Sequence, residues 1–258
     1  MSRQFDMRGW LQSWPYNPEN EVRVFRGRHG REILQVRLPL GFEQYELEGR
    51  PDGQQPRGAE SLLDYHLARL DEARAKGEAD SFGLTGDECA ELFQEGTLYY
   101  YRYLRLFQMR DWRCSIRDTV RNLRLFDFVR RHAERDEDQL YLEQWRPYLI
   151  RMNAMAETLN ALETDKHDDA LQFARDAIGH IERLDEIDDD TFRHEKERSL
   201  HALQEMVSHI DEIRPVPELE RLERELDQAI ALQAFERAAA LRDRIRILRS
   251  KAAGSVDS

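Results

Sequence analysis

Cysteine is scarce in this chain, and so are long apolar runs. Cys89 and Cys114 are the only two cysteines among 258 residues, and they are 25 positions apart, which excludes a disulfide framework and a Cys-x-x-Cys zinc site. No apolar stretch approaches the roughly 20 residues that cross a bilayer, and 35% of the residues are charged. The first residues also lack the apolar core of a signal peptide. We therefore expect a cytoplasmic protein that does not contact membranes.

The motifs of common catalytic and cofactor sites are also missing. There is no Walker A sequence, no Gly-rich dinucleotide fingerprint and no Gly-x-Ser-x-Gly elbow. Three histidines on one expected helix, His194, His201 and His209, are seven and eight residues apart, too far to share one metal ion. The sequence therefore predicts a protein that is not an enzyme and that has no metal and no cofactor.

Positive charge is in the minority, because the formal net charge is −12. Such a surface repels phosphate, which makes general affinity for nucleic acid unfavourable. The charge is uneven, however, and six arginines follow the helical period within an arc of about 80°. This arginine stripe consists of Arg110, Arg113, Arg117, Arg121, Arg124 and Arg131. We favour an arrangement in which the stripe remains solvated or docks on the acidic segment 185–190 of the same chain. The alternatives are binding to an acidic protein and binding to nucleic acid.

Only the first part of the chain has the alternation of β-strands. Apolar residues alternate with polar ones at Val22 and Val24 and again at Leu34, Val36 and Leu38, on either side of a turn at 27–30. A third strand follows around Tyr45. We expect a small β meander within residues 1–58.

From Ala59 onward the pattern is helical. We expect helices from about 62 to 76, 85–107, 110–134, 138–163, 167–184 and 191–213, with a capping box at Thr85–Glu88 and a kink or a new start at Pro147. The fold class is therefore mainly α, an array of antiparallel helical hairpins in a domain spanning 59–213. Residues 168–178 are similar to a tetratricopeptide helix, but no 34-residue period is present.

The last forty residues have the most regular apolar pattern. Leu219, Leu222, Leu226 and Ile230 share one helical face, and Phe235, Ala238, Leu241, Ile245 and Leu248 define a second amphipathic helix. Small alanines let two such helices approach closely. A hairpin of this size, 217–250, cannot bury all its apolar residues by itself, so we expect it to contact a partner. The segment 214–217, with two prolines, predicts a short stiff joint before it.

This segment resembles a known family. Ala229 followed by Phe235-Glu236-x-Ala238-Ala239-x-x-Arg242-Asp243-x-Ile245 is similar to the UVR domain, a helical hairpin of the B and C subunits of the bacterial excision nuclease and of some adaptors of stress proteolysis. Gln233 departs from the family, which usually has an apolar residue there, and Leu232 is expected to compensate. The paired zinc-binding cysteines of the stress adaptors are absent. The resemblance implies a module for protein–protein contact.

We therefore expect a non-catalytic adaptor that binds another protein, through a helical hairpin of that protein, in DNA excision repair or protein quality control. Leu226, Ile230, Phe235 and Leu241 would form the apolar anchor, and Glu236, Arg242 and Asp243 would orient the partner. Ala238, Ala239 and Ile245 complete the predicted site. A symmetric homodimer through the same hairpin is a further arrangement. The alternatives are a nucleic-acid-associated protein that uses the arginine stripe and a tetratricopeptide-like scaffold.

Overall fold

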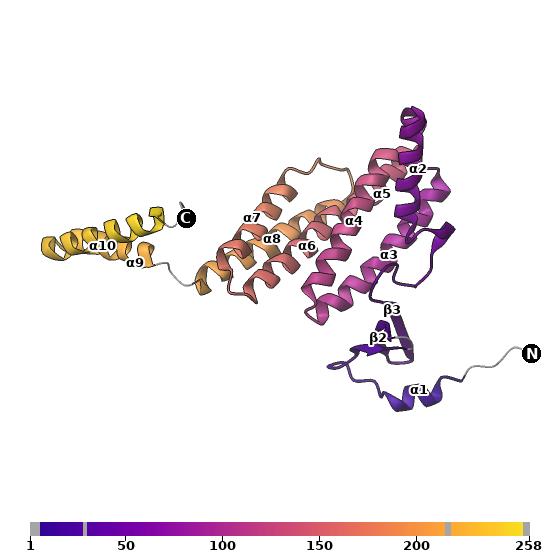
Figure 1. Ribbon diagram of the computed structural model, residues 1–258, viewed down its shortest axis with the longest axis horizontal. Helices are drawn as coiled ribbons and strands as arrows, with labels where there is room; N and C mark the ends of the chain where they lie inside the picture. The colour runs from indigo at the N-terminus through magenta and orange to yellow at the C-terminus, as the bar shows by residue number, and fades with distance from the viewer. Residues whose placement is uncertain (1–5, 28–29, 215–217, 255–258) are drawn as a thin grey trace, which may run out of the picture. The chain divides into compact units, whose positions relative to one another are not determined.

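The computed structural model of the protein describes residues 6–27, 30–214 and 218–254. The protein is mainly α-helical with a small three-stranded sheet near the N-terminus, as predicted (Figure 1). The chain divides into two compact units, residues 1–209 and 210–258, and each is considered separately below. Arg28 and His29 of the predicted 27–30 turn, and residues 215–217 of the predicted joint, lie outside the described residues.

The sheet is an antiparallel meander that follows a short helix, α1 (Arg8–Ser13). Its strands are β1 (Val22–Arg26), β2 (Glu32–Leu38) and β3 (Gly41–Glu46), in the order β1-β2-β3. Val24 pairs with Leu34 and Leu34 with Tyr45, so these three side chains lie on one face of the sheet. Leu34 and Tyr45 of that face form a cluster with Leu106 of the helical region. The alternation in the sequence therefore predicts the meander correctly. It predicts the burial only in part, because Val24 is 44% exposed and Ile33 of the opposite face is buried.

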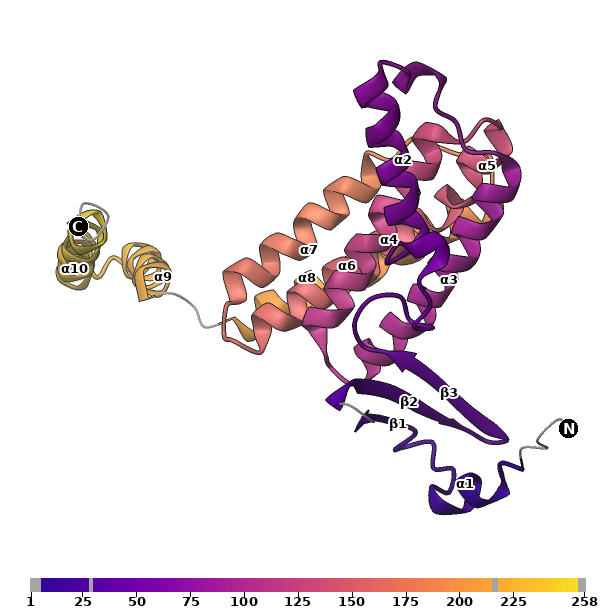
Figure 2. The ribbon, with the colours of Figure 1, turned by 45° about the vertical axis from the view of Figure 1, so that its right-hand side comes forward.

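Helices make up most of the rest of the first unit, and the last of them, α8, continues four residues into the second. They are α2 (Leu62–Lys76), α3 (Gly86–Gln108), α4 (Trp112–His132), α5 (Asp136–Tyr141), α6 (Arg146–Leu162), α7 (His167–Glu182) and α8 (Asp190–Ile213). Short 3₁₀ turns lie at Pro56–Gly58, Ala79–Ser81 and Glu143–Trp145. The most extensive packing joins α3 to α4, α4 to α6 and α6 to α7, which run side by side (Figure 2). This confirms the predicted array of helical hairpins.

Local sequence signals fix several of these helix ends. Thr85 and Glu88 form the predicted capping box, in which each side chain binds the backbone of the other residue. The expected helix 138–163 is in fact two helices, because Pro147 lies in the first turn of α6. A proline is tolerated there, since the first backbone N–H groups of a helix have no intrahelical acceptor. Of the two outcomes predicted for this proline, the structure shows the new start.

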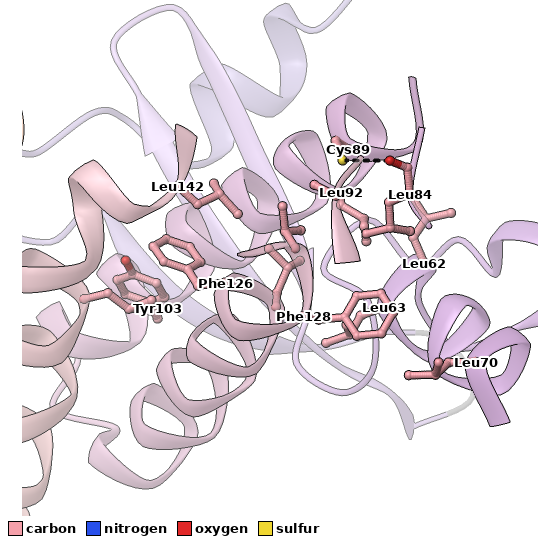
Figure 3. Packing of buried hydrophobic residues seen from close by; sticks show 14 of the residues in the cluster. Leu62, Leu63, Leu70, Leu84, Cys89, Leu92, Tyr103, Phe126, Phe128 and Leu142 are labelled. Carbon is pink, nitrogen blue, oxygen red and sulfur yellow. Dashed lines mark hydrogen bonds between the residues drawn. The ribbon is translucent and has the colours of Figure 1, made fainter. Parts of the chain in front are cut away.

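The main core lies among α2, α3, α4 and α6 (Figure 3). Leu84, Leu92 and Leu125 are completely buried there, and the Cys89 thiol lies 3.9 Å from the carbonyl oxygen of Leu84. A second cluster joins α6, α7 and α8 around Ile181 and Leu203. Among the described residues, none of the helices is long and apolar enough to cross a bilayer.

A buried arginine attaches the sheet to the helices. Arg102 of α3 is 1% exposed and donates hydrogen bonds to both carboxylate oxygens of Asp118, at 2.6 and 2.8 Å. It also donates to the carbonyl oxygens of Glu46 and Gly49, each at 2.8 Å. The guanidinium therefore bridges α4 and the end of β3.

Candidate protein-interaction site

The predicted terminal hairpin is formed by α9 (Glu218–Ala231) and α10 (Phe235–Gly254), which pack against each other (Figure 1). The connection is three residues long. Ala234 donates to the carbonyl oxygen of Ala229 at 2.8 Å, and Gln233 donates to that of Ile230 at 3.0 Å. These are the two hydrogen bonds of a Schellman motif, which closes the C-terminus of α9. The motif requires a left-handed residue, and Gln233 occupies it with φ of 56°.

The interior of the hairpin consists of small and branched apolar side chains. Leu222 and Ala229 of α9 are buried against Ala238, Leu241 and Ile245 of α10. Leu226 and Ala234 are partly buried against the same cluster. Ala229 and Ala238 are 2% and 4% exposed, so a small side chain stands on each helix at the contact. This arrangement allows close approach of the two helices, as the alanine pattern predicts.

Three apolar side chains remain exposed where the two helices meet the turn. Ile230, Leu232 and Phe235 are 42%, 78% and 72% exposed. They lie within six consecutive residues, so we call them the apolar tip. Apolar side chains of this size are mostly buried in folded proteins, and a group of them in water marks a contact surface.

The predicted charged residues of the site lie on α10. Glu236, Arg242 and Asp243 are exposed, as the predicted orienting role requires. Asp243 accepts a hydrogen bond from Arg246 at 2.8 Å. Arg237 of α10 lies 3.7 Å from Glu225 of α9, which links the two helices across their exposed side.

The structure separates the predicted site residues into two groups. Ala238, Leu241 and Ile245 face the other helix, and Leu226 is partly buried with them, so these four hold the hairpin together. The exposed members are Ile230, Phe235, Glu236, Ala239, Arg242 and Asp243. The side chains of Leu219 and Leu248 lie outside the described residues. Leu232 was not among the predicted site residues, although its place beside Gln233 was a signal that could have identified it.

The arginine stripe has a different arrangement from the one that periodicity predicts. Arg110 precedes α4, because Asp111 caps the helix by accepting a hydrogen bond from the backbone N–H of Cys114. Its φ of 61° belongs to the end of α3, where Arg110 donates to the carbonyl oxygen of Phe107 at 3.0 Å and Asp111 donates to that of Leu106 at 2.9 Å, the two hydrogen bonds of a Schellman motif. The predicted helix 110–134 is therefore two residues shorter at each end. Arg113, Arg124 and Arg131 lie on α4 and are exposed.

The two central arginines of the stripe bind other parts of the first unit. Arg117 donates to the carbonyl oxygen of Leu47 at 2.6 Å and pairs with Glu48 at 3.0 Å. Arg121 pairs with the buried carboxylate of Glu95, and its guanidinium lies 3.9 Å from the centre of the Tyr99 ring. Glu95 in turn accepts the first backbone N–H groups of α2. These two arginines therefore hold the sheet and α2 in place.

The acidic segment 185–190 pairs with cations outside the stripe. Asp185 lies 2.9 Å from Arg130, Glu186 lies 2.5 Å from Lys196, and both Asp188 and Asp190 pair with Arg193. Arg117 and Arg121 pair within the chain, as one of the predicted alternatives requires, but the predicted partner segment, 185–190, is wrong. The partners are Glu48, Asp118 and Glu95 instead.

Comparison with known proteins concerns the hairpin. No curated protein and no solved structure matches the chain. The family model of the UVR domain, described as the UvrB/uvrC motif, matches residues 218–251. This range is α9, the turn and all but the last three residues of α10. The terminal hairpin of this protein is therefore a UVR motif, as its Phe-Glu, Ala-Ala and Arg-Asp order predicts.

Proposed function

We propose that the protein is a non-catalytic adaptor that binds another protein through the apolar tip of its UVR hairpin. The observation that supports this most directly is the exposure of Phe235 and Leu232 on an element whose interior is already filled by other side chains. Leu241 belongs to that interior, so in this proposal it supports the hairpin and Leu232 replaces it in the anchor. The partner acts in DNA excision repair or in protein quality control.

Charge along the hairpin favours a partner that is itself a helical hairpin. α9 carries five acidic and two basic residues, a net charge of −3, whereas α10 carries six basic and two acidic residues, a net charge of +4. A second hairpin with an acidic and a basic helix can place each helix beside the one of opposite charge. Complementary charge sets the orientation of such a complex and raises its association rate, while the apolar tip supplies affinity.

The test is capture of partners from a cell extract by the full-length protein and by a Phe235→Ser variant. A matched control is Leu40→Ser, because Leu40 is 89% exposed and lies in the first unit, between β2 and β3. We expect Phe235→Ser to lose the main partner and Leu40→Ser to retain it. Equal capture by both variants would contradict the proposal. A change in molar mass by light scattering with Phe235→Ser would identify the partner as a second copy of this chain.

A second candidate function uses the exposed part of the arginine stripe. Arg113, Arg124 and Arg131 lie 11 and 7 residues apart, so they share one line along α4 and span about 27 Å. Phosphates of a nucleic acid could contact this line. Replacing all three by Ala should then reduce the salt dependence of binding to DNA or RNA by about three counterions. Absence of any salt-dependent binding by the unaltered protein would remove this candidate.

A further inference from the structure

The first unit contains a cavity of about 440 Å³ that the adaptor role does not use. It lies between α3, α4, α6 and α8, and its volume is within the range of roughly 300–1,000 Å³ that is typical of small-molecule sites. Six aromatic side chains line it: Phe93, Tyr100, Tyr103, Phe126, Trp145 and Tyr148. Trp145 is 43% exposed and Phe126 only 6%, so the cavity extends from the surface into the main core.

The tyrosines of the wall are held by one another. The ring centres of Tyr100 and Tyr103 are 5.5 Å apart in an edge-to-face arrangement, and those of Tyr100 and Tyr148 are 6.2 Å apart. The hydroxyl of Tyr148 interacts with those of Tyr100 and Tyr103. Burial raises the pKa of Tyr103 and Tyr148 well above the ordinary value, so both hydroxyls are neutral. The wall is therefore preformed and uncharged, which suits a flat apolar group.

One end of the cavity is charged, because α8 contributes Glu195 and Arg198. The Glu195 side chain is only 8% exposed, and no described residue donates a hydrogen bond to its Oε2 atom. A guanidinium nitrogen of Arg151 lies 3.5 Å from that atom. Arg198 lies 3.6 Å from the other oxygen of Glu195, and its side chain is 62% exposed. A buried carboxylate oxygen without a donor is costly, so a ligand that donates to it would gain affinity.

The two charged residues of the lining select among simple ligands. Glu195 and Arg198 have a net charge of zero, so a lone ammonium group could pair with Glu195 but would lie beside the like charge of Arg198. A lone carboxylate could pair with Arg198 but would leave Glu195 Oε2 without a donor. A ligand that carries both groups on one carbon can satisfy Glu195 and Arg198 together, because their charged atoms are only 3.6 Å apart.

We propose that this cavity binds a free α-amino acid with an aromatic side chain. The ring lies among the aromatic residues of the wall, the ammonium group donates to Glu195, and the carboxylate pairs with Arg198. The site belongs entirely to the first unit, so its occupancy is measured independently of the hairpin and its partner.

The test uses three compounds with the same phenyl group: phenylalanine, 2-phenylethylamine and 3-phenylpropionate. Titration calorimetry with the full-length protein should show the tightest binding for phenylalanine. Glu195→Gln should weaken phenylalanine by about tenfold or more, to the level of 3-phenylpropionate. Arg198→Ala should weaken it to the level of 2-phenylethylamine. Glu197→Gln is the matched control, because Glu197 is an exposed carboxylate on the same helix and does not line the cavity.

Equal affinity for the three compounds, or no binding of phenylalanine, would overturn the proposal. Unchanged binding by Glu195→Gln would also overturn it, provided that the variant unfolds at the same temperature as the unaltered protein. If that variant does not fold, Arg198→Ala decides, because an arginine side chain that is largely in solvent can be removed with little effect on stability.

Discussion

Two alanine substitutions in α10 separate the residues that build the hairpin from the residue that we assign to docking. Leu241 is 8% exposed and faces α9, whereas Phe235 is 72% exposed. Leu241→Ala should destabilise the hairpin by about 2–5 kcal/mol, since the lost side chain leaves a cavity. A pair of helices has little stability to spare, so this variant should lose α9 and α10 as ordered helices.

Phe235→Ala should weaken binding to the partner while leaving the hairpin folded. Full burial of a phenylalanine side chain is worth about 1.5–3 kcal/mol, and Phe235 is 72% exposed. The substitution should therefore cost the hairpin less than about 1 kcal/mol. A partner that covers the ring would lose about 1–2 kcal/mol of binding free energy, which raises the dissociation constant about 5- to 30-fold.

The assay is amide hydrogen exchange of α9 and α10 in both variants, together with titration of the captured partner. We expect Leu241→Ala to lose both protection and binding, and Phe235→Ala to lose binding while protection remains. If Phe235→Ala removes protection as well, the ring holds the hairpin together and the docking assignment fails. If it retains full affinity, the partner contacts another surface.

Three further predictions concern the stability of the two units. Arg102→Met should destabilise the first unit by about 3–5 kcal/mol in urea unfolding, because the buried Asp118 carboxylate loses its two shortest hydrogen bonds. The exposed control Arg113→Met should change the free energy of unfolding by less than about 0.5 kcal/mol. Equal losses in the two variants would refute the bridging role of Arg102. Gln233→Gly should slow exchange in α9 by relieving roughly 1 kcal/mol of left-handed strain, whereas faster exchange would show that the glutamine side chain stabilises the turn. His66 is completely buried, and burial lowers its pKa to about 4, below the ordinary value of 6.5. As the pH falls, His66 gains a proton in the unfolded chain before it does so in the folded protein. The free energy of unfolding should therefore fall by about 2–3 kcal/mol between pH 6.5 and pH 4. His66→Gln should not show this fall, whereas the exposed control His201→Gln should.

Local signals in the sequence predict the helices and the UVR hairpin well, because their causes lie within a few residues. The capping box at Thr85, the proline at the start of α6 and the three- and four-residue spacing of Leu222, Leu226 and Ala229 each act over one or two turns. The Asp111 cap also acts within one turn, and it places Arg110 before α4 and outside the helical stripe.

Contacts between distant segments could not be predicted in this way. Arg117 pairs with Glu48, 69 positions away, and Arg121 pairs with Glu95, 26 positions away. Periodicity gives the direction of each side chain on its own helix but not the element that it faces. For this reason the arginine stripe is a poor guide to free positive surface. The same limit applies to the aromatic cavity, whose walls come from four helices.

The turn of the hairpin connects its stability with its exposed surface. Leu232 and Phe235 flank Gln233 and Ala234. The backbone hydrogen bonds of the Schellman motif therefore fix the backbone positions from which both apolar side chains extend. Affinity depends on how much conformational freedom a contact surface loses on binding. A turn closed by two backbone hydrogen bonds has already lost most of that freedom before the partner arrives. The same geometry that ends α9 therefore presents the apolar tip in a fixed arrangement, which is what a small docking surface needs to bind tightly.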